Sequence, residues 1–164
     1  MRGLVALALL GGCATRLLDT DGGARSCGTI DLDPSQLVGA STSPSALHAT
    51  TLVVKSGTSG QGFTATTVDG AADTRSFHLA LHGTPMAMDY RFDIDVTADD
   101  SASLDYKDGN QRWLSLDGML HLVPAGTSSM ITLSNLTMRA DPSTPAQGRM
   151  RIDGNGTFDI SCAQ

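Results

Sequence analysis

Strict alternation of apolar and polar side chains over residues 86–96 is the feature that most constrains the fold of this chain. Successive side chains of a β-strand point to opposite faces, so period-two alternation predicts a strand with one face in a core and one in solvent. The apolar positions on the predicted core face are Met86, Met88, Tyr90, Phe92, Ile94 and Val96.

Composition extends this expectation to the whole chain. All 17 acidic residues are Asp, there is no Glu, only two of the 11 basic residues are Lys, and 18 residues are Gly. Good helix formers are therefore scarce, whereas residues that favour turns are abundant. Short alternating runs separated by turn residues predict an all-β domain. We expect a single antiparallel β-sandwich of about eight to ten strands, in preference to a closed barrel.

Alternation also assigns side chains in the neighbouring runs. Phe77, Leu79 and Leu81 share one face of a strand that ends before residues 83–85. Leucines at 114, 116, 120 and 122, with Gly118 between them, predict a longer strand, and its parity places Trp113 on the outer face. Further on, the apolar phase reverses between residues 133 and 136, which predicts a β-bulge near residues 134–135.

The last segment, residues 149–162, allows two interpretations. A three-residue loop at 154–156 would make a hairpin that pairs Ile152 with Phe158. A single long strand with two inward glycines, Gly154 and Gly156, keeps the same parity and is the alternative.

The N-terminus predicts export. Leu10-Gly11-Gly12-Cys13 follows a short apolar stretch and has the form of a bacterial lipobox, in which the Cys13 thiol receives a lipid. The stretch is much shorter than the roughly 20 apolar residues of a transmembrane helix. We expect a lipoprotein signal peptide at 1–12, the lipidated cysteine and a tether at 13–26, and the β-sandwich domain at 27–164. An ordinary signal peptide cut elsewhere is the alternative.

Two cysteines, Cys27 and Cys162, flank the predicted domain. An even pair in an exported protein predicts a disulfide that joins the first and last strands, with two buried thiols as the alternative. Closing so long a loop should stabilise the fold by about 4–5 kcal/mol.

Charge and motifs limit the function classes. Without residues 1–12, ten basic residues face seventeen acidic ones, a net charge of −7, which argues against a nucleic-acid partner. The sequence shows no spacing of Ser, His and Asp typical of nucleophilic catalysis and no zinc motif, so we expect neither an enzyme nor a cofactor. A hydrolase built on two Asp residues is the third choice of function.

Several residues could bind a metal or ligand. A cluster of acidic residues, and the run 153–159 with an oxygen donor at every second position, could each form a calcium site. Trp113 could form a flat platform for a sugar. We favour simpler accounts, in which the acidic cluster is a solvated strand face, the run 153–159 is a hairpin turn, and Trp113 covers an edge. The members of the acidic cluster are Asp93, Asp95, Asp99 and Asp100. A copper site would need His78, His82, Met86 and Met88, but alternation separates the histidines from the methionines.

The layout resembles small β-sandwich lipoproteins of Gram-negative bacteria, including myxobacteria. The residues that carry the resemblance are Leu10–Cys13, 117–120 (DGML) and 156–162 (GTFDISC). The resemblance implies a last strand with a G-x-F pattern and a disulfide closed by the cysteine near the C-terminus, with no catalytic residues. Ala14 after the cysteine resembles the enterobacterial sorting pattern for the outer membrane. We therefore expect a lipid-anchored cell-envelope protein with a non-catalytic binding or surface-structural domain and a protein or glycan partner; the alternative is a module that binds calcium, copper or carbohydrate.

Overall fold

The domain is built from ten β-strands, in a computed structural model that describes residues 26–37, 44–58 and 62–163. The described residues contain no α-helix, and a short 3₁₀-helix, η1 (Ile160–Cys162), follows the last strand. The all-β class is therefore confirmed. The strands are β1 (Gly28–Gln36), β2 (Leu47–Ala49), β3 (Leu52–Thr58), β4 (Thr64–Ala72), β5 (Arg75–His82), β6 (Met88–Phe92), β7 (Ser101–Asp108), β8 (Gln111–Ala125), β9 (Ser128–Ala140) and β10 (Arg149–Asp159).

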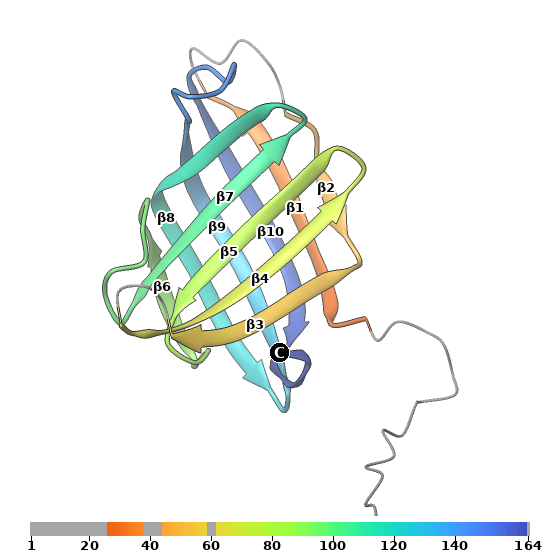
Figure 1. Ribbon diagram of the computed structural model, residues 1–164, viewed down its shortest axis with the longest axis vertical. Helices are drawn as coiled ribbons and strands as arrows, with labels where there is room; N and C mark the ends of the chain where they lie inside the picture. The colour runs from red at the N-terminus through yellow and green to blue at the C-terminus, as the bar shows by residue number, and fades with distance from the viewer. Residues whose placement is uncertain (1–25, 38–43, 59–61, 164) are drawn as a thin grey trace, which may run out of the picture.

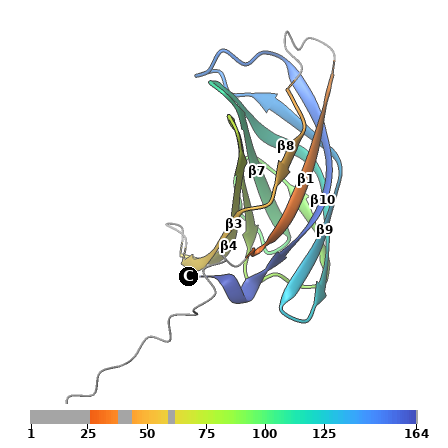
Figure 2. The same ribbon diagram turned by 90° about the vertical axis from the view of Figure 1, so that its right-hand side faces the viewer.

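All ten strands belong to one sheet, in the order β2-β1-β10-β9-β8-β6-β7-β5-β4-β3. Neighbours are antiparallel except β6 and β7, which run parallel, so the sheet is mixed. The sheet curls until its edges approach, and it is nearly closed into a barrel (Figures 1 and 2). The expected number of strands is confirmed, but they form one continuous sheet instead of two separate layers.

The concave face of the curled sheet holds the hydrophobic core. Leu79 and Leu81 of β5 are 1% and 0% exposed, as the alternation predicts. Other strands contribute further fully buried side chains, of which the largest are Trp113, Tyr90, Tyr106 and Phe158. The interior is therefore filled by side chains, and most polar side chains of the strands face outward.

The strand expected over residues 86–96 is only five residues long. Within it Tyr90 and Phe92 are buried, so the predicted parity is confirmed there. Met86 lies outside the strand and is 60% exposed, so its assignment to the core was wrong. Strand β6 inserts between β8 and β7 and pairs with β7 through only two residue pairs, which limits its length.

Two bulges in the β8–β9 pair change which side chains face the core. On β9 the register shifts next to Asn135, whose φ is 56°, and Leu133 and Leu136 are both buried; the predicted bulge is confirmed. On β8 an additional shift lies between Ser115 and Asp117. Because the extra residue reverses the alternation, odd positions face the core before this bulge and even positions after it.

Strand β10 is a single strand, so the hairpin at 154–156 was wrong and the alternative with two inward glycines is correct. These glycines lie against β1. A Cβ on Gly154 would lie 2.6 Å from the carbonyl oxygen of Asp31, and one on Gly156 would lie 2.3 Å from that of Thr29. Glycine is needed here because the two backbones approach too closely for any side chain.

The Cys27–Cys162 disulfide joins the residue before β1 to the end of η1 and is confirmed, with a Cα–Cα distance of 5.9 Å. We call this end of the barrel the disulfide end. Within residues 26–37, 44–58 and 62–163, no helix has the length and apolar character needed to cross a bilayer.

Candidate functional site

A groove of about 360 Å³ runs over the outer face of β3, β4, β5 and β7, and we call it the outer groove. Strands alternate their side chains between faces, so the polar residues that face away from the core line it. Val53 and Ala71 add exposed apolar surface. The lining residues are Thr51, Val53, Asp69, Gly70, Ala71, Ser76, Phe77, His78, Asp105 and Lys107.

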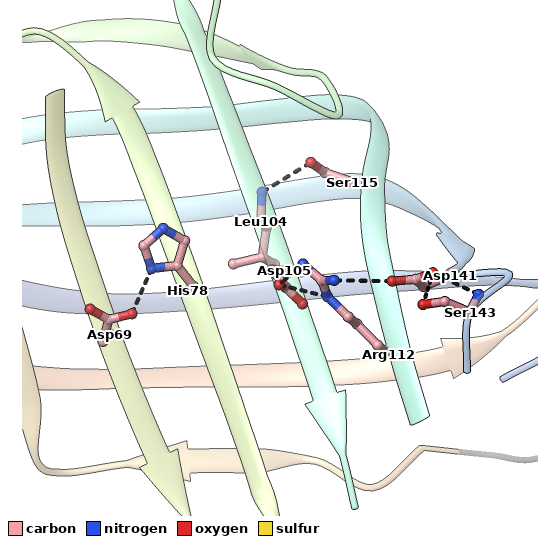
Figure 3. A network of polar contacts seen from close by, with 8 residues as sticks. All are labelled: Asp69, His78, Leu104, Asp105, Arg112, Ser115, Asp141 and Ser143. Carbon is pink, nitrogen blue, oxygen red and sulfur yellow. Dashed lines mark hydrogen bonds and ion pairs between the residues drawn. The ribbon is translucent and has the colours of Figure 1, made fainter. Parts of the chain in front are cut away.

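Strand register places three ionisable side chains in one row across the groove. His78 lies directly opposite Asp69 on one side and Asp105 on the other. Its Nδ1 is 2.6 Å from Asp69 Oδ1 (Figure 3). A hydrogen bond from Nδ1 to the carboxylate leaves Nε2 of a neutral imidazole as an acceptor, so Asp69 fixes the orientation and tautomer of His78.

Three of the four histidines follow this pattern, and the fourth also contacts an aspartate. His48, His78 and His121 each lie directly opposite the aspartate that they contact, namely Asp31, Asp69 and Asp89. His82 lies 3.5 Å from Asp99 and stacks on Phe63 with ring centroids 4.4 Å apart. Cross-strand His–Asp pairing is thus a general feature of this outer face, and only His78 stands in the outer groove.

Asp105 is held in place by a chain of ion pairs. Its Oδ2 accepts hydrogen bonds from Arg112 Nε at 2.8 Å and Nη2 at 2.6 Å, while Arg112 Nη1 donates to Asp141 Oδ2 at 3.0 Å (Figure 3). The hydrogen bond with Asp105 raises the pKa of Arg112 further. Asp141 Oδ1 also accepts from the Ser143 hydroxyl and backbone N–H, and these bonds, with Arg112 nearby, lower the pKa of Asp141. Arg112 and Asp141 are therefore both charged at neutral pH, and Arg112 links the two aspartates.

The second oxygen of Asp105 is the unusual atom of the site. Asp105 Oδ1 is buried and receives no hydrogen bond from any described residue, although the side chain lines the outer groove. An unpaired buried acceptor costs roughly 1–3 kcal/mol. Because Oδ1 is closed off from solvent, a ligand in the groove would use the accessible groups instead: Lys107 can donate to it and Nε2 of His78 can accept from it.

The arrangement does not bring together a nucleophile and a base. Ser76 and His78 are two positions apart on β5, and a strand rise of about 3.3 Å per residue separates their Cα atoms by roughly 6.6 Å. Among the described residues, no hydrogen bond joins their side chains. The groove is thus suited to binding through fixed polar groups.

A second hollow of about 530 Å³ lies where the edge strands of the sheet meet. Three of its four aspartates already have partners: Asp31 contacts His48, and Asp73 Oδ2 lies 2.8 Å from Arg75 Nη2. Asp153 accepts from Arg151 Nε at 2.9 Å and from the Asn135 backbone N–H at 2.9 Å, and these bonds lower its pKa. The outer groove is the better candidate because strand register lines up Asp69, His78 and Asp105 across it.

Trp113 is not on the surface. It is 0% exposed in the core, with its ring centroid 6.3 Å from that of Tyr106, so its placement on the outer face was wrong and it offers no platform for a sugar. The bulge beside Leu116 reverses the alternation that placed Trp113 outside.

Ser115, expected on the outer face, is also buried, and it bridges the point where β6 separates β7 from β8. It accepts from the Leu104 backbone N–H at 2.9 Å (Figure 3) and donates to the Asp93 carbonyl. Backbone groups left unpaired by the separation of two strands need such a partner. Sequence reasoning missed this role because it depends on the strand order.

The acidic cluster does not assemble into a cation site. All four members are exposed, Asp93 Oδ1 accepts from the Ile94 backbone N–H at 2.6 Å, and Asp99 contacts His82. In the described part of the chain, no three His, Cys, Asp or Glu side chains are grouped as a metal would require. The cluster members are Asp93, Asp95, Asp99 and Asp100.

The other metal hypotheses do not match this geometry either. The run 153–159 is extended strand, and Asp159 Oδ1 accepts from the Ser161 backbone N–H instead of closing a calcium loop. The residues of the copper hypothesis have other surroundings: His78 pairs with Asp69, His82 stacks on Phe63, and Met86 is exposed. Cys13, the predicted lipidation site, lies outside the described residues.

Comparison with known proteins gives no match, because no family model, curated protein or solved structure matches this chain.

Proposed function

We propose that this chain is an exported lipoprotein, anchored through Cys13, whose domain is a non-catalytic module that binds a hydroxyl-rich ligand in the outer groove. The observation that carries the proposal is the row across the groove formed by Asp69, His78 and the carboxylate of Asp105, which strand register places side by side. Arg112, itself held by Asp141, fixes this carboxylate before any ligand arrives. Preorganisation of this kind reduces the ordering cost of binding.

The chemistry of the groove favours a sugar-like ligand. Asp69 and Asp105 accept hydrogen bonds from hydroxyl groups, Lys107 donates them, and Val53 and Ala71 offer apolar surface to C–H groups. Carbohydrate binding through Trp113 was an alternative in the sequence analysis; the proposal moves carbohydrate binding to the outer groove. The cell envelope supplies glycans, which agrees with the predicted lipid anchor.

Two substitutions test the groove. In the full chain, Asp105→Ala should weaken binding of an envelope-derived oligosaccharide by about 10- to 100-fold, because a hydrogen bond to a charged group contributes about 1.5–3 kcal/mol. Asp89→Ala is the matched control, since Asp89 is also an outward aspartate that lies opposite a histidine on the neighbouring strand, but it is outside the groove. Calorimetric titration against a panel of such oligosaccharides gives both values. Saturable binding that survives Asp105→Ala would contradict the assignment.

The anchor has a separate test. Expressed in a Gram-negative host, the chain should carry a lipid on Cys13 as its new N-terminus, visible by intact mass, and should enter the detergent phase on phase separation. Cys13→Ser should abolish both results. An unmodified Cys13, or cleavage at another position, would contradict the lipoprotein assignment and leave the groove to be judged by its own titration.

A further inference from the structure

An apolar patch covers the tip of the β8–β9 hairpin. Val123 and Met130 lie directly opposite each other on the outer face and are 43% and 54% exposed. Met86, 60% exposed, lies toward the same end, because it precedes β6 and Met88 pairs with Leu122. We call Met86, Val123 and Met130 the apolar tip.

The hairpin that carries this tip lacks charge. Residues 122–131 (LVPAGTSSMI) contain no Asp, Arg, Lys or His, in a chain with 17 acidic and 11 basic residues. The outer face farther up the same sheet is charged, and it carries His121 paired with Asp89. Exposed apolar side chains gathered at one end of a domain typically mark an interaction surface.

The apolar tip lies at the end where the chain enters the domain. Thr127, in the β8–β9 turn, accepts a hydrogen bond from the Ile160 backbone N–H at 3.0 Å, and Gly28 pairs with Phe158. The turn, the start of β1 and the C-terminus therefore meet at the disulfide end (Figures 1 and 2).

The length of chain before Ser26 determines how far this end can lie from a membrane. Thirteen residue steps separate Ser26 from Cys13. Even fully extended, at about 3.3–3.6 Å per residue, they span roughly 45 Å. A lipid on Cys13 therefore keeps the disulfide end, with its apolar tip, within reach of the bilayer.

We infer that the apolar tip is a second membrane contact, which inserts Val123, Met130 and Met86 into the interfacial region of the lipid surface to which Cys13 is anchored. This inference rests on the proposed lipid anchor and adds the orientation of the domain. The mature net charge of −7 offers no electrostatic attraction to anionic lipid, so apolar burial provides the contact. The outer groove, on the side of the barrel, then remains open to solvent.

A pair of tryptophan reporters tests the contact. The full lipidated chain is reconstituted into phosphatidylcholine vesicles brominated on the acyl chains, with Met130→Trp as the reporter and Leu37→Trp as the matched control. Leu37 is 38% exposed and follows the far end of β1. Trp113 is buried in both proteins and adds the same background. The Trp at 130 should shift to the blue and lose most of its emission to bromine, whereas the Trp at 37 should lose none.

The outcomes separate the two proposals. Flotation of the lipidated chain with vesicles while Trp reporters at both 123 and 130 stay unquenched overturns the tip contact alone. Equal quenching at 37 and 130 also overturns it, because the domain then has no preferred end at the membrane. Failure to float overturns the anchor, and the tip contact with it. Val123→Trp is the second reporter, which keeps the test decisive if Met130→Trp does not fold.

Discussion

Two strand pairs in this sheet, β1–β10 and β8–β9, accommodate the bending of the sheet in different ways. Both must bend a long ladder so that ten strands nearly close around a core. In β1–β10 the register is continuous over nine residue pairs, and two glycines let the backbones approach closely. In β8–β9, bulges beside Leu116 and Asn135 interrupt the register.

The difference shows what each solution does to the side chains. Glycines preserve the alternation, so Ile152 and Phe158 face the core at either end of β10. A bulge reverses it, so Trp113 and Leu120 can both face the core from one strand. The side-chain links at the ends of the two pairs differ as well: a disulfide joins the ends of β1–β10, and the Arg112–Asp141 ion pair joins the ends of β8–β9.

Removing the disulfide of the β1–β10 pair should have the largest effect on stability. Cys27→Ser with Cys162→Ser opens a loop whose ends are 135 residues apart, which should lower the free energy of unfolding by about 5 kcal/mol in the chain-entropy model. Urea denaturation of the chain in a Cys13→Ser background measures this. An unfolding free energy that is unchanged would mean that the disulfide adds nothing to the strand pairing.

The bulged pair is tested by Trp113→Ala, which should cost about 3–5 kcal/mol because it empties a fully buried site. If Trp113 lay outside, as simple alternation predicts, the same change would cost about 0.5 kcal/mol or less. Met119→Ala is the matched control, because Met119 lies on the same strand and is 40% exposed. Equal midpoints for the two variants would remove the evidence for the bulge in solution.

How much of this could be predicted follows from the same contrast. Alternation placed Phe77, Leu79 and Leu81 in the core, and the phase change in β9 located its bulge, because both signals are local in the sequence. The bulge on β8 left no comparable signal. Leucines continue at even positions through it, and only Gly118, whose φ is +146°, marks the irregularity.

The outer groove was harder to predict for a different reason. Asp69, His78 and Asp105 are unremarkable as outward residues of three strands, and they form a row only through the register of β4, β5 and β7. Register between strands depends on contacts far apart in the sequence. The acidic cluster was a candidate site because its members are close in sequence, yet they do not converge in space.

Glycine substitutions sharpen the comparison further. Gly156→Ala should lower the free energy of unfolding by about 2–3 kcal/mol, because its Cβ would collide with the Thr29 carbonyl oxygen and β1 would have to move. Gly57→Ala on β3 is the control: no atom lies within 4 Å of its Cβ, so stability should rise by roughly 0.5–1 kcal/mol. A tolerated Gly156→Ala would show that the two strands are farther apart than the register implies. Thermal unfolding of the two variants side by side is sufficient.

Removing the Arg112–Asp141 ion pair of the β8–β9 pair should have the smallest effect on stability, and that effect should depend on pH. Hydrogen bonds from Ser143 and the charge of Arg112 lower the pKa of Asp141 below its unfolded value of about 3.9. The folded state therefore binds fewer protons than the unfolded state in this range, so the contribution is fully present above about pH 4 and is lost as pH falls through the folded pKa. Asp141→Asn should lower the melting midpoint slightly at pH 7, and the difference from the parent chain should shrink steadily below pH 4.

A control on the same strand pair separates this ion pair from a general loss of negative charge. Asp117 is exposed on β8, away from Arg112, and Asp117→Asn should leave the midpoint at pH 7 unchanged. If Asp141→Asn and Asp117→Asn behave alike at every pH, Arg112 does not hold the end of this pair, and its role is confined to orienting Asp105. In that case the charge network would serve the outer groove alone, and the β8–β9 pair would depend on its bulged packing.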